Sequence, residues 1–243
     1  MTAVRSTSSG AGTPRELTAP VEDYLKVIYE IESESETGSA GAGTNEIAEA
    51  LGIAPASVSG MVRRLAEQGL IAHERYRGVR LTDQGRRAAL RTIRRHRVIE
   101  SYLARALGYP WDRVHDEAER LEHSCSDELI DRMAAAIGEP TTDPHGHPIP
   151  ARDLTLAEQH LQQLAVVAAG SRVRVERVSD RDGDRLRYLA ELGVTPGTVV
   201  EVVRREPFEG PIALRIGRVE RVIGPALAAH VLVSSIEKRR KAR

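Results

Sequence analysis

Apolar residues recur with a helical period through the first half of the chain. They stand three or four positions apart, which places them on one face of a helix. This period predicts helices over residues 20–31, 44–51, 54–68, 83–107 and 111–137. Between the third and fourth of them, LIAHERYRGVRLT (70–82) has the pattern of two short strands joined at Arg77-Gly78, a β-hairpin.

The period changes to two in the last third of the chain. After a Pro- and Gly-rich segment, GEPTTDPHGHPIPARD (138–153), four alternating runs follow from Ser171: RVRVERV, TVVEVVRR, IALRIGR and VERVIG. Turn residues separate these runs, and one helical turn is predicted near LRYLAELG. The pattern predicts a small all-β module behind a mainly α-helical N-terminal half.

Composition narrows the class of protein. One cysteine among 243 residues excludes an intramolecular disulfide framework and any Cys-rich zinc or iron–sulfur cage. No apolar run approaches the roughly 20 residues that span a bilayer, and the N-terminus lacks the apolar stretch of a secretory signal. We therefore expect a cytoplasmic protein with no membrane partner.

Charge is neutral in total but segregated. The 35 basic and 35 acidic residues cancel. Residues 44–97 carry eleven arginines against five acids, whereas residues 99–131 carry nine acids against three arginines. The first segment is suited to polyanions and the second to cations.

The basic segment has the order of a winged helix-turn-helix: helix, glycine turn, helix, hairpin. Small residues on the outer face of the helix 54–68 would allow insertion into a major groove. The arginines would lie near phosphates, which position the protein on DNA without reading sequence. The predicted DNA-contacting residues are Ala56, Ser57, Ser59, Gly60, Arg63, Arg64, Arg75, Arg77 and Arg80.

The acidic segment contains HDEAERLEH (115–123). Its residues His115, Glu119, Glu122 and His123 share one helical face, within an arc of about 100°. On the preceding helix, His96 and Glu100 form an i, i+4 pair. Carboxylate and imidazole without thiolate favour Mn²⁺ or Fe²⁺ over a tetrahedral thiolate zinc site.

Two further histidines occur in the DPHGHP stretch, and they resemble a metal-binding tract. Because His145 and His147 stand among prolines and a glycine, we interpret them as loop residues.

These motifs together resemble the diphtheria toxin repressor family of metal-dependent transcriptional repressors. The resemblance covers about residues 17–150 and rests on motifs in family order: VEDYLKVIYEIE, the helix-turn-helix, RYRGVRLTDQG, RRHRVIE, WDRVHDEAERLEHSCSDEL and DPHGHPIP. The β-module resembles the SH3-like domain of the longer members and the small accessory proteins of ferrous iron transport.

The resemblance implies two metal positions. The primary one would be Asp23, Glu119, Glu122 and His123, and the ancillary one His96, Glu100 and His115. The iron-responsive branch has Met and Cys at the places of Asp23 and Glu119, so the two carboxylates resemble the manganese-responsive branch. In the SH3-like domain, Asp182 or Asp184 would replace the usual Glu and Gln. Lys26 replaces a Glu of the short manganese regulators, which puts their two-metal cluster in doubt here.

The resemblance also implies a homodimer that binds a pseudo-palindromic operator duplex. Whether one or two dimers bind each operator is left open. Ile130, Met133 and Ile137 would be interface residues. The predicted organisation is disorder over 1–16, a winged helix-turn-helix domain over 17–82, a helical dimerisation and metal domain over 83–150, a linker over 151–170, an SH3-like domain over 171–234 and a basic tail over 235–243.

The leading hypothesis is a manganese-activated repressor of metal-uptake genes, without enzymatic activity or a small-molecule substrate. Co²⁺, Ni²⁺ or Zn²⁺ would substitute in vitro. An iron(II)-activated repressor of the same family is the first alternative. A metal chaperone or transport accessory built around the β-module is the second. A metallohydrolase is a third, disfavoured because no separate general base, phosphate loop or nucleophile motif accompanies the carboxylates.

Overall fold

The computed structural model describes residues 17–34, 41–74, 78–157 and 159–236. The predicted disordered segment 1–16 and most of the basic tail lie outside the described residues. The chain forms two compact units, residues 1–89 and 90–243, which divide within one long helix. Among the described residues, no helix combines the length and the apolarity that crossing a bilayer requires.

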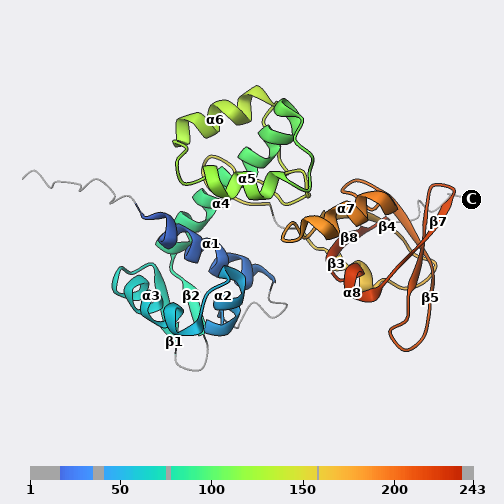
Figure 1. Ribbon diagram of the computed structural model, residues 1–243, viewed down its shortest axis with the longest axis horizontal. Coiled ribbons are helices and arrows are strands. Elements are labelled where there is room, and N and C mark those ends of the chain that lie inside the picture. The colour runs from blue at the N-terminus through green and yellow to red at the C-terminus, as the bar shows by residue number, and fades with distance from the viewer. Residues whose placement is uncertain (1–16, 35–40, 75–77, 158, 237–243) are drawn as a thin grey trace, which may run out of the picture. The chain divides into compact units, whose positions relative to one another are not determined.

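The N-terminal unit is the winged helix-turn-helix that the sequence predicts (Figure 1). Its elements are α1 (Ala19–Glu34), α2 (Thr44–Leu51), α3 (Pro55–Glu67), β1 (Ile71–Glu74) and β2 (Gly78–Leu81). The two strands pair antiparallel, and Ala42 extends the wing by exchanging backbone hydrogen bonds with Val79. The helical period predicts this unit well because each apolar stripe is buried in its core.

Glu32, near the end of α1, connects that helix to the wing. Its carboxylate accepts a hydrogen bond of 2.9 Å from the backbone N–H of Leu81 and one of 3.1 Å from the Arg86 guanidinium. These contacts join the first helix to β2 and to the start of the long helix α4 (Asp83–Leu107). The charge-assisted pair is a specific anchor for the wing.

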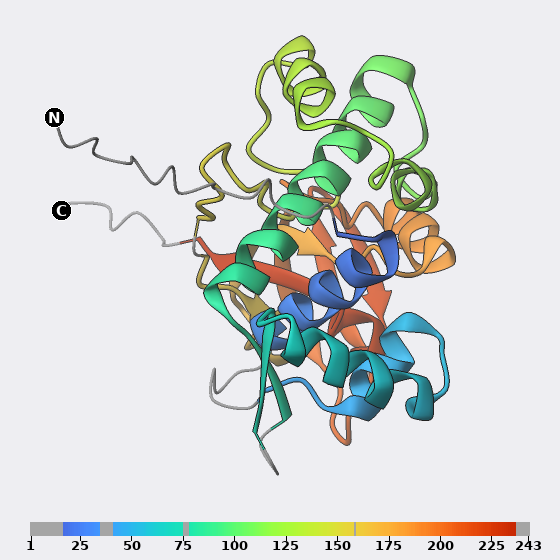
Figure 2. The ribbon, with the colours of Figure 1, turned by 90° about the vertical axis from the view of Figure 1, so that its left-hand side faces the viewer.

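The helical part of the C-terminal unit consists of α4 from Leu90 onward, α5 (Val114–Leu121) and α6 (Asp127–Ala136). The whole of α4 has 25 residues, and Figure 2 shows it as one unbroken helix. The prediction of a single helix over 111–137 is wrong, because the helix is interrupted between α5 and α6. The cause is local: the Ser126 hydroxyl accepts a hydrogen bond from the Leu129 N–H and starts a new helix.

The β-module is a six-stranded antiparallel sheet in the order β3-β8-β4-β5-β6-β7. Its elements are β3 (Gln162–Gln163), a 3₁₀ turn (Leu164–Val166), β4 (Arg172–Val178), α7 (Gly183–Leu192), β5 (Val199–Arg205), β6 (Ile212–Ile216), β7 (Val219–Ile223), α8 (Pro225–Ala228) and β8 (Val231–Ser235). The sheet includes β3 from the range predicted as a linker, because the fully buried Leu164 beside it packs into the module's core.

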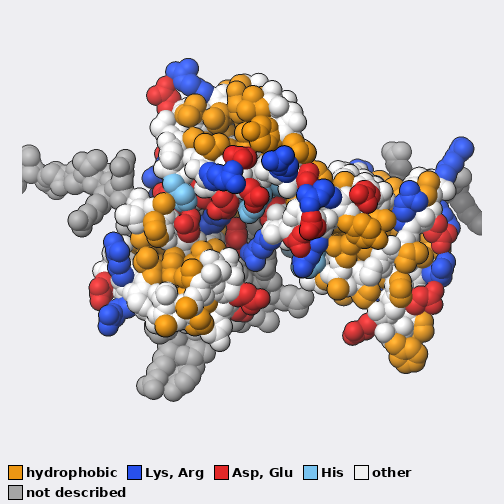
Figure 3. Space-filling view, viewed as in Figure 1, with side chains coloured by type: hydrophobic (Ala, Val, Ile, Leu, Met, Phe, Trp, Pro, Cys, Tyr) orange, Lys and Arg blue, Asp and Glu red, His pale blue; other side chains and the backbone are white. Residues whose placement is uncertain are grey.

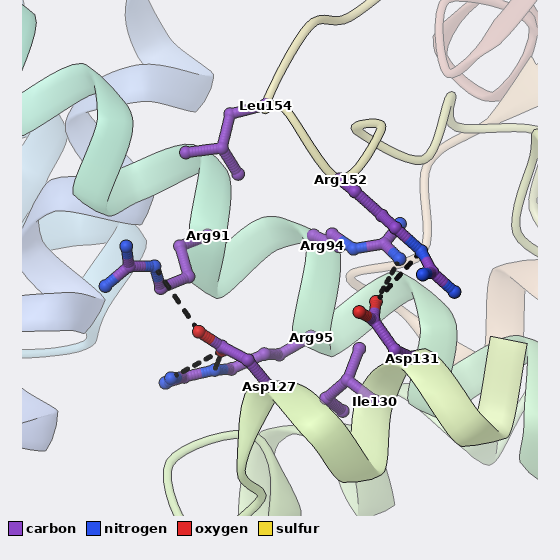
Figure 4. A pocket seen from close by; sticks show the side chains of 8 residues that line it. All are labelled: Arg91, Arg94, Arg95, Asp127, Ile130, Asp131, Arg152 and Leu154. Atoms are coloured by element: carbon purple, nitrogen blue, oxygen red, sulfur yellow. Dashed lines mark hydrogen bonds and ion pairs between the residues drawn. The ribbon is translucent and has the colours of Figure 1, made fainter.

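A network of ion pairs joins α4 to α6 in the C-terminal unit (Figure 4). Arg94 donates to Asp131 at 2.7 Å and to the backbone oxygen of Pro150 at 2.9 Å, and Arg95 donates to Asp127 at 2.9 Å. A cavity of about 120 Å³ lies among these side chains. Since the carboxylates already pair with the guanidinium groups, we interpret the network as a structural one that stabilises the packing of α6 on α4.

Candidate metal centres

His96 of α4 lies at the middle of the buried polar groups of the C-terminal unit. Its Nδ1 is 2.5 Å from Oε2 of Glu122, and its Nε2 is 3.0 Å from Oε1 of Glu100. The same Nε2 is 3.2 Å from Nδ1 of His115 on α5. The helical spacing of His96 and Glu100 on α4 therefore brings both residues against His115 of α5 and against Glu122, which directly follows that helix.

Three groups of potential metal ligands form within this unit, each with ligand atoms that all lie within 4.8 Å of one another. We name them by position. The helix cluster is His96, Glu119 and Glu122; the central cluster is His96, Glu100, His115 and Asp180; the loop cluster is Asp143, His145, His147 and Asp180. The shared residues make the three groups one continuous polar region.

Asp180 is the ligand candidate that the β-module contributes. Its Oδ2 is 3.8 Å from Nδ1 of His115 and 3.7 Å from Nδ1 of His147, so it belongs to both the central and the loop cluster. It lies two residues after the end of β4 and two residues before Asp182, the nearer of the two positions that the family resemblance suggested.

Asp182 and Asp184, the residues singled out from the sequence, have other partners. Asp182 caps the start of α7, where its side chain accepts hydrogen bonds from the backbone N–H groups of Asp184 and Arg185. Asp184 pairs with Arg187 at the surface. Neither belongs to a ligand cluster of the described residues. The helix needs an N-cap at this place, so the register of α7 directs Asp182 to the backbone.

The loop cluster comes from the segment that the sequence assigns to a loop. That segment has no regular structure, but the His145 side chain is completely buried and that of His147 is only 14% exposed. Its Nδ1 lies 3.7 Å from Oε1 of Glu100, and Nδ1 of His147 lies 3.2 Å from Oδ2 of Asp143. The alternation of Asp143, His145 and His147 at every second position is the sequence signal that could have identified this cluster.

Gly146 and one hydrogen bond hold that loop against the β-module. The backbone N–H of Val178 donates to the carbonyl oxygen of His145 at 3.0 Å. Gly146 has φ +90°, and a Cβ there would lie 1.8 Å from the carbonyl oxygen of Glu176. Only glycine permits this approach, so the close packing of loop on strand brings the two histidines to Asp180.

Several polar atoms of the region are buried without a hydrogen-bond partner among the described residues. They are Oε2 of Glu100, Oδ2 of Asp143, Nδ1 of His145 and Nδ1 of His147. Burying such groups unpaired costs free energy, and buried carboxylates are expected to be paired or metal-bound. All four residues belong to the ligand clusters, so a cation bound there would give these buried atoms a partner.

Electrostatic coupling within the region shifts the pKa values of its groups strongly. Burial alone would lower the pKa of His145, but attraction to Glu100, Asp143 and Asp180 outweighs it and raises the pKa to about 9. Burial would raise the pKa of Asp180, yet the neighbouring histidines lower it to about 2. The pKa of Glu100 is likewise held well below its usual range by His96, His115 and His145, against the effect of burial. Glu100 and Asp180 are thus ionised at neutral pH and favour any positive charge placed between them.

The ligand chemistry fits a divalent ion. Atoms that bind one ion at about 2.0–2.6 Å lie roughly 3–4 Å from one another, which is the range of the separations within the loop and central clusters. Every ligand atom in the three clusters is an imidazole nitrogen or a carboxylate oxygen. Such ligands suit Mn²⁺ and Fe²⁺, among other divalent ions.

The four residues predicted for the primary position are divided between the two units. Glu119 and Glu122 belong to the helix cluster, and Nε2 of His123 lies 3.5 Å from Oε1 of Glu122. Glu122 is completely buried, whereas Glu119 is half-exposed. Asp23 stands on α1, in the N-terminal unit. The primary ligand set remains a prediction.

The outer face of α3 presents the residues predicted to contact DNA. Val58, Val62 and Leu65 pack into the core of the N-terminal unit, and the opposite face is exposed to solvent. That exposed face includes Ala56, Ser57, Ser59, Gly60, Arg63 and Arg64. Arg80 on β2 is half-buried, and Arg75 and Arg77 lie outside the described residues.

Family models match nearly the whole described chain. The DNA-binding N-terminal domain of iron-dependent repressors matches residues 16–79, and their metal-binding and dimerisation domain matches residues 82–151. The chain belongs to the diphtheria toxin repressor family of metal-dependent transcriptional repressors. The FeoA domain, which is SH3-like, matches residues 162–235 and accounts for the β-module.

Two named relatives are similar over most of their length. The iron-dependent repressor IdeR of Mycobacterium leprae is 34% identical over 89% of this chain and 97% of its own. The diphtheria toxin repressor of Corynebacterium diphtheriae is 30% identical over 79% of this chain and 88% of its own.

Solved structures give a complementary comparison. A manganese-dependent transcriptional repressor in complex with manganese is 40% identical, with a TM-score of 0.83 over 89% of this chain and all of that one. The manganese regulator SloR is 29% identical, with a TM-score of 0.75 over 89% of this chain and 98% of its own. The chain is thus a metal-dependent transcriptional repressor of the family, and the comparisons include both iron and manganese regulators.

Membership of the family implies duplex DNA and a second copy of the chain as partners. Figure 3 shows hydrophobic side chains gathered over the α6 region of the helical domain. Among the predicted interface residues, Ile130 is buried within its own protomer, with 1% exposure, and therefore cannot supply much interface area. The exposed large hydrophobic residues of α5 and α6 are Leu121 and Leu129.

Proposed function

We propose that this protein is a manganese-activated repressor of metal-uptake genes. The observation that carries the proposal is the ligand chemistry of the three clusters, which consists of carboxylate and imidazole alone. Glu119 supplies a carboxylate in the helix cluster, where a softer thiolate would favour other ions. The 40% identical structure of a manganese-dependent repressor supports the same assignment.

In this proposal, one divalent ion would join the two units through the primary ligands. Asp23 of α1 would bind the ion together with Glu119, Glu122 and His123, and the ion would add positive charge to this acidic set. Occupancy would then fix α1 and, through Glu32, the wing that follows α3. The spacing of the two α3 helices in a dimer would depend on the ion.

The energetic requirement is a difference in affinity. Metal must bind the DNA-competent conformation more tightly than the other conformation, because equal affinity for both would shift no population. By linkage, operator DNA would tighten metal binding by the same factor. Reciprocal tightening is therefore a quantitative signature of the proposed mechanism.

The central and loop clusters would hold additional metal and join the helical domain to the β-module. Asp180 would be the ligand from the β-module, shared between His115 on one side and His147 on the other. In this proposal the β-module tunes the metal response of the repressor without contacting the operator.

An iron(II)-activated repressor is the second candidate, favoured by the names of the mycobacterial and corynebacterial relatives. A titration separates the two. Operator binding would be measured anaerobically against free Mn²⁺ and free Fe²⁺, with Glu122→Ala as the metal-site variant and Glu128→Ala, on exposed α6 surface, as its control. Activation by Fe²⁺ at a far lower free concentration than Mn²⁺ would overturn the manganese assignment.

A metal chaperone or transport accessory is the candidate of another class, suggested by the FeoA match. Removing residues from 151 onward would separate the classes. A repressor is expected to retain metal-dependent operator binding with an altered metal response, whereas a chaperone would lose its main activity.

A further inference from the structure

Gly60 occupies the outermost position of α3. At about 100° per residue, the buried Val58 and Val62 each point about 160° away from it around the helix axis. Its neighbours on the exposed face, three and four positions away, are Ala56, Ser57, Arg63 and Arg64. Any ligand that approaches the middle of this face meets position 60 first.

The fold gives no reason for a glycine at this place. Gly60 lies inside a 13-residue helix with an ordinary helical φ, and a Cβ built on it meets no atom of the described residues within 4 Å. Other glycines of the same unit have evident structural roles. A Cβ at Gly85 would lie 1.9 Å from the carbonyl oxygen of Leu70, and Gly52 ends α2 with φ +64°.

A glycine in a helix interior lowers helix stability relative to alanine. Within the part of the unit that the structure describes, no packing or backbone geometry at Gly60 offsets that loss. The remaining physical reason for glycine is the close approach of something outside the chain. The second helix of a helix-turn-helix enters the major groove, so the approaching surface is the edge of the base pairs.

We propose that Gly60 helps to determine the sequence specificity of DNA binding. Because it has no side chain, the α3 backbone can approach the base edges at the floor of the major groove. The space that a Cβ would fill is taken by a group that projects from the base edges, such as a thymine methyl. Ser57 and Ala56 are thereby brought within reach of the neighbouring bases, while Arg63 and Arg64 remain near phosphates. This inference rests on the proposed DNA-binding role of α3.

The test uses full-length, metal-loaded protein and a duplex selected from random-sequence DNA by the wild type. Gly60→Ala is expected to unfold at the same temperature as the wild type or higher. Its affinity for the selected duplex should fall at least tenfold, and its affinity for an unselected duplex should stay within twofold. The slope of affinity against salt concentration should be unchanged, because the phosphate contacts are retained.

Gly224→Ala is the matched control. Gly224 precedes α8 in the β-module with φ −70°, and a Cβ there also meets nothing within 4 Å. That variant should bind the selected duplex like the wild type. A second variant, Gly60→Ser, should select a different central sequence from random DNA.

Three results overturn the inference. The first is unchanged affinity of Gly60→Ala for the selected duplex, and the second is a lowered unfolding temperature, which would mean that the fold needs the glycine. The third is selection of the wild-type sequence by Gly60→Ser. Failure of the proposed function is distinguishable, since the wild type would then show no metal-dependent binding to any duplex.

Discussion

Nδ1 of His115 lies 3.8 Å from Oδ2 of Asp180. The histidine belongs to α5 of the helical domain and the aspartate follows β4 of the β-module, so a ligand pair connects two parts of the chain that are 65 residues apart in sequence. Nothing but tertiary packing brings them together. The pair indicates how a metal ion can make the β-module part of the response.

Asp180→Asn is expected to weaken metal binding at the central and loop clusters by at least about tenfold, since the amide removes the charge that the ion would neutralise. Equilibrium binding of Mn²⁺ to the whole protein measures the loss. Asp184→Asn is the control, because this exposed carboxylate pairs only with Arg187 among the described residues. If both variants bound Mn²⁺ like the wild type, Asp180 would have no place in a metal site.

Exchanging the two primary carboxylates for softer ligands should change the metal preference. Asp23→Met combined with Glu119→Cys is expected to lower the free Fe²⁺ needed for operator binding relative to Mn²⁺ by roughly tenfold, because thioether and thiolate favour softer ions. The measurement is operator affinity against each free metal concentration under anaerobic conditions. An unchanged ranking of the two metals would argue against these ligands.

The histidine charge makes the stability of the metal-free protein depend on pH. The folded-state pKa of His145 is raised to about 9, against 6.5 for an ordinary histidine. The stability it contributes is therefore fully present below pH 6.5 and is lost as the pH rises through 9. The loss in the free energy of unfolding is on the order of 3 kcal/mol at most. It arises in part from the attraction between His145 and Glu100, which also lowers the pKa of Glu100.

Thermal unfolding with a chelator, at pH 6 and pH 9, would measure this effect. His145→Asn should flatten the dependence. Manganese affinity should rise over the same interval, because the ion must displace the proton from the imidazole. A metal-free protein more stable at pH 9 than at pH 6 would contradict the assignment.

Gly146→Ala should strongly disturb the contact between the loop and the β-module. The new Cβ would collide with the Glu176 carbonyl oxygen, and the backbone would be held at φ +90°. We expect a loss of about 2–4 kcal/mol in the free energy of unfolding. Gly138→Ala is the matched control: its φ is also positive, +83°, but its Cβ would meet nothing within 4 Å, so only about 1 kcal/mol of backbone strain is expected.

Arg63→Ala should weaken binding to all duplexes by a similar factor. Removing one phosphate contact lowers the slope of log affinity against log salt by about 1. Metal affinity of the free protein should not change, because Arg63 lies on the exposed face of α3. A slope equal to that of the wild type would remove this arginine from the set of phosphate contacts.

The sequence by itself determined the local elements and part of the metal chemistry. Helical periods are encoded by neighbours three and four residues apart, so α1 to α4 follow from the apolar pattern, and His96 and Glu100 share a helical face for the same reason. The β-strand alternation is equally local, and it marks β4 to β7. The break after α5 was missed because the Ser126 cap competes with a continuing helical period.

Only the tertiary structure decided which distant residues meet. Asp180 faces the histidines while Asp182 caps a helix, and the difference depends on the register of α7 against the loop. His145 has the sequence context of an exposed loop residue, yet it is buried because Gly146 lets its segment pack onto β4. Contacts between surfaces depend on the shapes of both partners, and neither segment alone contains that information.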